Sequence, residues 1–99
     1  MANIASNEAI VVFKEGVTVS TKEDFYNDLK EELEIYNDCS FDINDKTVNV
    51  IELSFGSRWN EPIELLQKLC DEYKCSIYGV CYEWGCLYVN HYEITPLIP

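Results

Sequence analysis

Hydrophobic and polar positions follow two different periods in successive segments of this chain. Residues 8–13 form a short apolar run rich in β-branched side chains, which predicts a buried strand. Ser20 then begins a capping-box pattern with Glu23 three residues later, and apolar side chains follow at helical spacing. This pattern predicts an amphipathic helix over residues 21–36. Its apolar positions are Phe25, Leu29, Leu33 and Tyr36.

Two runs with a period of two occupy the middle of the chain. Residues 39–43 and 47–55 each alternate apolar and polar side chains, and a turn sequence at 44–46 separates them, which predicts an antiparallel hairpin. One face of the second run carries Ile51, Leu53 and Phe55. A loop is expected over residues 56–60. A second amphipathic helix is expected over residues 61–73, with Asn60 as its N-cap.

The last two strands are expected over residues 75–82 and 86–94. The three residues between them fit a hairpin loop in which Gly85 takes the left-handed conformation. In that register Tyr82 pairs with Cys86, and the two strands share a tyrosine-rich face. The members of this face are Tyr78, Val80, Tyr82, Cys86, Tyr88 and Tyr92. His91 is expected on the opposite face, together with Cys75.

The predicted order of elements is β-α-β-β-α-β with one added strand. This order predicts an α+β fold, a ferredoxin-like βαββαβ sandwich with an added C-terminal strand and two helices on one face of an antiparallel sheet. The length of 99 residues suits one ferredoxin-like domain over residues 1–99.

Three short stretches resemble a known family. Residues 1–7 resemble the opening Met-Ala-Asn-Trp-Cys-x-Asn of the YubB-like ferredoxin-like domain proteins, small proteins of plasmids, phages and other mobile elements. Residues 59–63 are similar to the Trp-x-x-Pro-Ile helix entry of that family, and residues 82–85 resemble its Tyr-Glu-x-Gly turn. Ile4 and Ala5 depart from the family's Trp and Cys. The resemblance implies the ferredoxin-like fold and a mobile-element setting, and it brings no catalytic residues.

The charge of the chain is strongly acidic. Asp and Glu total 18 against 7 Lys and Arg, which gives a net charge of −11. A hydrophobic fraction of 47% and an aromatic fraction of 13% distinguish the chain from a disordered acidic tail. The charge argues against direct binding of nucleic acid, which needs a basic surface, and against binding to an anionic membrane. The expected partner is a basic protein.

Targeting and metal-binding patterns are missing from the sequence. There is no run of 18 apolar residues, and residues 1–7 contain neither a basic nor an apolar segment. The spacing of the five cysteines, at positions 39, 70, 75, 81 and 86, does not match that of zinc-binding motifs, and we expect them to be reduced thiols. We therefore expect a cytoplasmic protein of the host cell with no metal and no cofactor.

The sequence gives little support for a catalytic site. Cys75 and His91 are expected on one face, but a reactive thiolate needs an electropositive setting that this chain does not supply. No two carboxylates stand apart from the others as an acid–base pair, and no phosphate-binding glycine motif occurs. The chain is therefore not expected to be an enzyme.

Negative charge is concentrated in the first predicted helix. Residues 20–38 hold seven acids and two lysines, a net charge of −5. Like charges three or four residues apart destabilise a helix by roughly 0.2–0.5 kcal/mol per pair. Two interpretations stay open, a functional acidic surface and an ordinary solvated helix face. The candidate partner-binding carboxylates are Glu23, Asp24, Asp28, Glu31, Glu32 and Glu34.

Aromatic side chains supply a second candidate surface. Tyr78, Tyr82 and Tyr88 are candidate interface anchors on the tyrosine-rich face, and Trp84 at the hairpin tip is a candidate exposed anchor. The alternative is that the added strand or the C-terminal tail covers this face.

Three hypotheses follow from these surfaces. In the first, the chain is an acidic mimic of nucleic acid that inhibits a host defence effector, of the anti-CRISPR or anti-restriction type. In the second, it is a non-catalytic accessory protein that docks or forms a homodimer through the tyrosine-rich face. In the third, it is a thiol-dependent enzyme.

Overall fold

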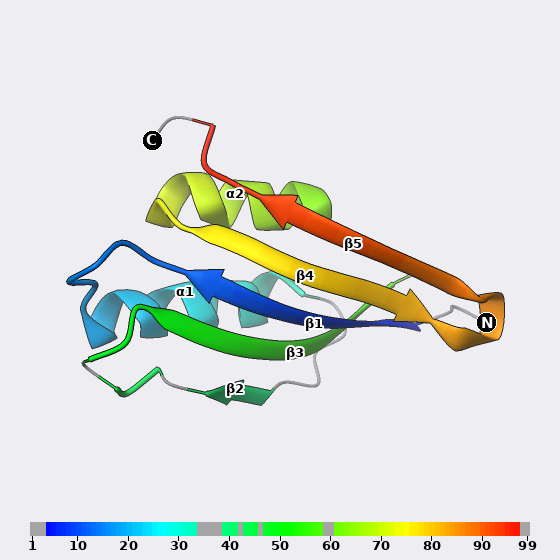
Figure 1. The fold of residues 1–99 in the computed structure, drawn as a ribbon, viewed down its shortest axis with the longest axis horizontal. Coiled ribbons are helices and arrows are strands. Elements are labelled where there is room, and N and C mark those ends of the chain that lie inside the picture. The colour runs from blue at the N-terminus through cyan, green and yellow to red at the C-terminus, as the bar shows by residue number, and fades with distance from the viewer. Residues whose placement is uncertain (1–3, 34–38, 42, 46, 59–60, 98–99) are drawn as a thin grey trace.

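Five strands form one antiparallel sheet, and two helices pack on one of its faces (Figure 1). The computed structural model describes residues 4–33, 39–41, 43–45, 47–58 and 61–97. The strand order is β2-β3-β1-β4-β5. The elements in chain order are β1 (Ile4–Val12), α1 (Val19–Glu32), β2 (Cys39–Phe41), β3 (Val50–Arg58), α2 (Ile63–Tyr73), β4 (Ser76–Glu83), the 3-10 turn η1 (Trp84–Cys86) and β5 (Tyr88–Ile94). This arrangement confirms the predicted ferredoxin-like α+β fold with an added strand.

The central strand β1 begins earlier than the sequence predicts. It starts at Ile4 rather than at residue 8, and its side chains alternate between exposed and buried along its whole length. The prediction depends on a run of large apolar residues. It misses the first half of β1 because the buried positions there hold a small side chain, Ala5, and a polar one, Asn7. β3 likewise continues to Arg58, through residues predicted to be a loop.

The core lies between the sheet and the two helices. The helices contribute Phe25 and Leu29 from α1, and Leu66 and Leu69 from α2, all buried. The Phe25 ring lies edge-on to Phe13, with 5.5 Å between ring centroids. The faces of the strands that meet the helices carry Ala5, Ala9, Val11, Ile51, Leu53, Phe55 and Ile77. The predicted face of Ile51, Leu53 and Phe55 is thus confirmed as the buried one.

Each helix has a defined end that the sequence pattern places only approximately. α1 begins after Thr18, whose hydroxyl accepts a hydrogen bond from the Thr21 N–H at 3.1 Å, so the cap is not Ser20. It ends at Glu32. α2 begins at Ile63, and the predicted cap Asn60 lies outside the described residues. Lys74 ends α2 in the left-handed conformation, with φ of 55°.

One lysine of α1 is part of the interior. Lys22 is not among the apolar positions of the predicted helix, so the pattern leaves it on the outer, charged face. That expectation is wrong, because its side chain is fully buried. Its ammonium group donates hydrogen bonds to the backbone carbonyls of Asp45, at 2.7 Å, and Val48, at 3.0 Å. A buried charge needs such partners. Through these two hydrogen bonds, Lys22 links α1 to the connection between β2 and β3.

We predict that Lys22→Met lowers the free energy of unfolding by about 1–3 kcal/mol, because two backbone carbonyls lose a charged donor. Urea unfolding followed by circular dichroism measures the change. The matched control is Lys30→Met, which removes the same charge from an exposed lysine lying 5.5 Å from the Tyr26 ring centroid. The control is expected to cost less than about 1 kcal/mol. Equal losses in the two variants would contradict the structural role of Lys22.

Candidate functional site

The sheet face opposite the helices is solvent-exposed. Within the described part of the chain, no helix lies on it (Figure 1). The described part of the tail after β5, residues 95–97, does not cover it either, because the Leu97 N–H donates to the Asp71 carboxylate of α2 at 2.8 Å. The Thr95 carbonyl likewise accepts from Gln67 of α2. The tail is therefore held against the helix layer.

Strand register arranges this face, here called the open face, in rows that cross four strands. Residues paired across antiparallel strands point to the same side of a sheet. The first row, from β3 to β5, is Glu52, Ile10, Tyr78 and Glu93. The second row is Ser54, Glu8, Val80 and His91, and the third is Gly56, Ser6, Tyr82 and Val89.

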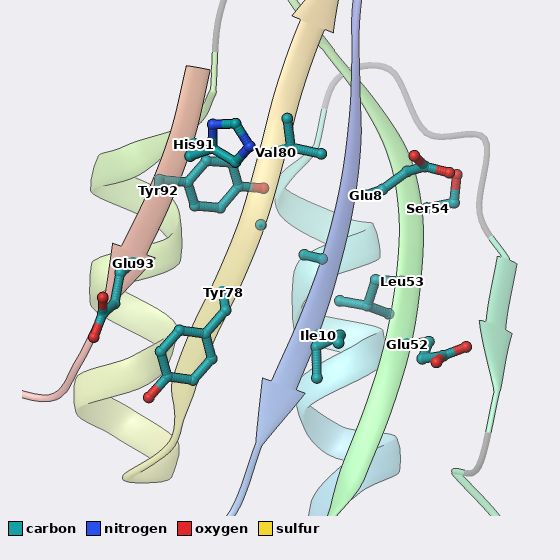
Figure 2. Close-up of a pocket in the computed structure, with 12 residues that line it drawn as sticks. Glu8, Ile10, Glu52, Leu53, Ser54, Tyr78, Val80, His91, Tyr92 and Glu93 are labelled. Atoms are coloured by element: carbon teal, nitrogen blue, oxygen red, sulfur yellow. The ribbon is translucent and has the colours of Figure 1, made fainter. Parts of the chain in front are cut away.

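A shallow pocket of about 940 Å³ lies over the first two rows (Figure 2). Ile10 and Tyr78, each 43% exposed, lie at its centre, together with the half-buried Val80. Figure 2 shows Glu52 and Glu8 on the side of β3, and Glu93 and His91 on the side of β5. The pocket is therefore apolar in the middle and carries carboxylates on both borders.

Charge on this face favours a cationic ligand. Glu8, Glu52 and Glu93 are all exposed. Glu52 and Glu93 stand three strand spacings apart, or about 14 Å. Arg58 lies at the far end of β3, beyond all three rows. An anionic ligand would meet three carboxylates here, whereas a cationic group could contact either border while apolar groups cover the centre.

The open face continues to the β4–β5 connection. Trp84 is 65% exposed, which confirms the prediction of an exposed tryptophan at the tip. Its ring centroid lies 5.0 Å from that of Tyr82, in the third row. The neighbouring Leu87 is 87% exposed and has a left-handed backbone, with φ of 54°. Through its contact with Tyr82, Trp84 extends the apolar surface beyond the pocket.

The predicted register of β4 and β5 is wrong. Tyr82 pairs with Val89 rather than Cys86, a shift of three residues, and an odd shift exchanges the two faces of β5. The reason is a longer connection, in which a 3-10 turn precedes Leu87 and Leu87 takes the left-handed position expected for Gly85. Tyr88 therefore lies on the helix side, so the open face keeps Tyr78 and Tyr82 only.

A hydrogen-bonded chain across four strands accompanies this register. Tyr92 of β5 lies on the helix side and passes over Gly79 of β4, where an added Cβ would stand 2.7 Å from the Tyr92 ring. Its hydroxyl donates to Oδ1 of Asn7, on β1, at 3.2 Å. Asn7 in turn donates to the Ser57 hydroxyl, on β3, at 2.8 Å. No sequence pattern indicates these hydrogen bonds, because the three residues are distant in sequence and Asn7 is fully buried.

Glu61 joins the start of α2 to the sheet. It accepts hydrogen bonds from the Tyr88 hydroxyl at 2.6 Å and from the Asn90 amide at 2.8 Å. Burial opposes its ionisation, but these hydrogen bonds outweigh burial and hold the pKa of Glu61 below its usual value. The same contact raises the pKa of Tyr88 to about 12. Tyr88 is thus a structural residue rather than an exposed anchor.

Two of the buried thiols, Cys75 and Cys81, have raised pKa values. Burial first, then the Glu61 carboxylate, raises the pKa of Cys81 to about 11. Contact with Cys70, together with burial, raises the pKa of the Cys75 thiol. The predicted neighbourhood of Cys75 and His91 is wrong, because His91 lies on the open face opposite Val80 while Cys75 is buried. These settings lower the reactivity of the thiols.

The carboxylates of α1 lie in the helix layer, and they are not equivalent. Glu23, Asp24, Glu31 and Glu32 are exposed. Asp28 is half-buried and accepts a hydrogen bond from the Tyr73 hydroxyl, so it has a structural partner. Glu32 lies 3.4 Å from the Lys68 ammonium of α2, and Glu34 lies outside the described residues.

The two candidate surfaces are on opposite sides of the molecule. Figure 1 shows α1 on one side of the sheet, whereas strand register places Tyr78 and Tyr82 on the other side, and the Trp84 ring lies next to Tyr82. A single flat partner surface cannot contact both. Within the described residues, no group of three His, Cys, Asp or Glu side chains could hold a metal ion, and no helix is long and apolar enough to cross a membrane.

We predict that Gly79→Ala lowers the free energy of unfolding by about 1–3 kcal/mol, because the new methyl group collides with the buried Tyr92 ring. Chemical unfolding measures the loss. The matched control is Gly85→Ala, whose added methyl would meet only the flexible end of the Glu83 side chain, at 3.0 Å. A Gly79→Ala variant as stable as the control would show that the Tyr92 contact does not set the packing of β5.

The Glu61 contact predicts a pH dependence. Because the folded-state pKa lies below the usual value, the stabilisation is present above about pH 4.5 and is lost as pH falls through the folded-state pKa. At neutral pH, Glu61→Gln is expected to cost about 1 kcal/mol in unfolding free energy. The difference from the parent protein should shrink as pH falls below about 4.5. The control is Glu64→Gln, which removes an exposed carboxylate from the first turn of α2 and is expected to change the unfolding free energy at neutral pH by less than about 0.5 kcal/mol.

A scan against protein-family models and searches of curated proteins and of solved structures find no match to this chain. The resemblance of its short motifs to the YubB-like family stays a prediction from the sequence. What can be inferred about function therefore depends on the surfaces of the protein itself.

Proposed function

We propose that this protein is a non-catalytic binding module that holds a positively charged segment of a partner protein on its open face. The observation that carries this proposal is the pocket of about 940 Å³ whose apolar centre is bordered by carboxylates on both sides. This function corresponds to docking through the sheet face, with Glu8, Glu52 and Glu93 added to the tyrosines.

Side-chain chemistry supports recognition of a protein. Tyrosine and tryptophan are favoured anchors at protein interfaces, and Tyr78, Tyr82 and Trp84 offer ring surface here. Aromatic side chains on an open sheet also suit stacking with RNA bases, but that mode needs cations around the rings for the phosphates. On this face the Tyr78 ring instead shares its pocket with Glu8, Glu52 and Glu93.

Charge also argues against a second copy as the occupant. Two open faces in contact would bring Glu8, Glu52 and Glu93 of one copy close to the same residues of the other. Each copy has a net charge of −11, so the long-range field opposes the encounter as well. A basic partner would instead be attracted by that field, and binding should weaken as salt rises.

The helix layer supports a second candidate function. Glu23, Asp24 and Glu31 expose carboxylates along α1, while the Lys22 ammonium is bonded to the backbone carbonyls of Asp45 and Val48. In this function the carboxylates stand in for phosphates, and the protein occupies the nucleic-acid channel of a basic host defence effector. The protein would then be an anti-CRISPR or anti-restriction inhibitor of a phage or other mobile element, acting in the host cytoplasm.

Two variants with equal charge distinguish the candidates. One is Glu8→Gln/Glu52→Gln/Glu93→Gln on the open face, and the other is Glu23→Gln/Asp24→Asn/Glu31→Gln on α1. The probe is a fluorescent peptide of leucine, lysine and arginine, with affinity measured by anisotropy at low and at moderate salt. We predict that the open-face variant weakens binding about tenfold, because each exposed ion pair contributes about 0.2–1 kcal/mol.

The α1 variant is the control and should change affinity less than about twofold. The opposite ranking would favour nucleic-acid mimicry through α1. Equal losses would mean that only the net charge matters, and both proposed sites would then be rejected. Affinity that does not change with salt would also contradict a charged site.

A further inference from the structure

We infer that the open face receives its partner as an amphipathic α-helix, with basic residues along both borders of an apolar stripe. This inference rests on the proposed function and specifies the conformation of the bound segment. It follows from three properties of the pocket: the backbone of its floor, its dimensions and the placement of its charges.

The floor offers no backbone partners to an extended segment. β1 is paired with β3 on one side and β4 on the other, and β4 is paired with β1 and β5. The N–H and C=O groups of both floor strands are therefore used within the sheet. A β-strand laid on this face would leave its own backbone groups against Ile10, Tyr78 and Val80, at a cost of about 1–3 kcal/mol for each unsatisfied group. A helix satisfies its own backbone.

The dimensions of the face also fit a helix. The pocket spans four strands, or three spacings of nearly 5 Å, which is about 14 Å between Glu52 and Glu93. A helix with its side chains is about 10–12 Å across. Along the strands, the first and third rows are four residues apart, or about 13 Å. That length corresponds to about nine helical residues.

The side chains of the face complement the pattern of such a helix. Ile10, Tyr78, Val80 and Tyr82 form a central apolar stripe that runs along β1 and β4. An amphipathic helix presents apolar residues at a spacing of three or four, and lysine or arginine can flank that stripe on each side. Glu52 and Glu8 would then meet one flank, and Glu93 the other. Trp84 would cover the end of the apolar stripe beyond the third row.

Three peptides of identical composition test the conformation. Each has about 18 residues, all leucine, lysine or arginine except for one proline, and this length exceeds the roughly 12–15 residues below which an isolated helix is marginal in water. The first has apolar residues at helical spacing, and the second alternates apolar and basic residues. The third repeats the helical pattern of the first, but its proline lies at the centre, whereas in the other two peptides the proline is the first residue. Binding is measured by anisotropy, and helix formation by circular dichroism of the complex.

The helical peptide is expected to bind about tenfold more tightly than the other two and to gain helical signal on binding. Ile10→Gln should weaken this binding about tenfold, since it removes the centre of the apolar stripe. The matched control is Ile63→Gln, an isoleucine 39% exposed on α2, which should change affinity less than about twofold.

The possible failures are distinguishable. If the alternating peptide binds as tightly as the helical one, and the open-face glutamates are still required, the helix inference is overturned while the proposed function stands. If none of the peptides binds, or if Ile10→Gln has no effect, the open face is not the site and the proposed function fails too. A dimer of the protein alone in sedimentation, lost in Ile10→Gln, would assign this face to a second copy and overturn both.

Discussion

The contact between the Tyr92 ring and the backbone of Gly79 determines which side of β5 faces solvent. A ring can lie there only because position 79 has no side chain. Its hydroxyl then reaches Asn7 and holds β5 in the observed register. Because side chains alternate with a period of two, a slip of one residue would bury His91 and Glu93 and expose Tyr92. The composition of the open face therefore depends on this one packing arrangement.

Polar groups in the helix layer join elements that are distant in sequence. Lys22 of α1 donates hydrogen bonds to the β2–β3 connection. Glu61, at the start of α2, accepts hydrogen bonds from Tyr88 and Asn90 of β5. Each group has hydrogen-bond partners that compensate for its burial. These polar contacts and the apolar core lie on the same side of the sheet. Among the described residues, the opposite side of the sheet has no helix packed on it.

The net charge acts on a partner at long range, whereas the apolar stripe acts only on contact. Exposed carboxylates occur on both sides of the molecule, so they attract a basic protein without selecting an orientation. The open face also has exposed apolar side chains, Ile10 and Tyr78, which line its pocket. In the proposed function, charge therefore increases the rate of encounter, and the stripe determines which surface binds.

The sequence by itself determined the order of elements, the ferredoxin-like fold class, the buried face of Ile51, Leu53 and Phe55, and the exposure of Trp84. These features depend on local periodicity and on turn position, which neighbouring residues specify. The burial of Lys22, the pairing of Tyr82 with Val89 and the assembly of the pocket were decided by the tertiary structure. Each depends on contacts between residues far apart in the chain, and an error of an odd number of residues in a turn exchanges the two faces of a strand.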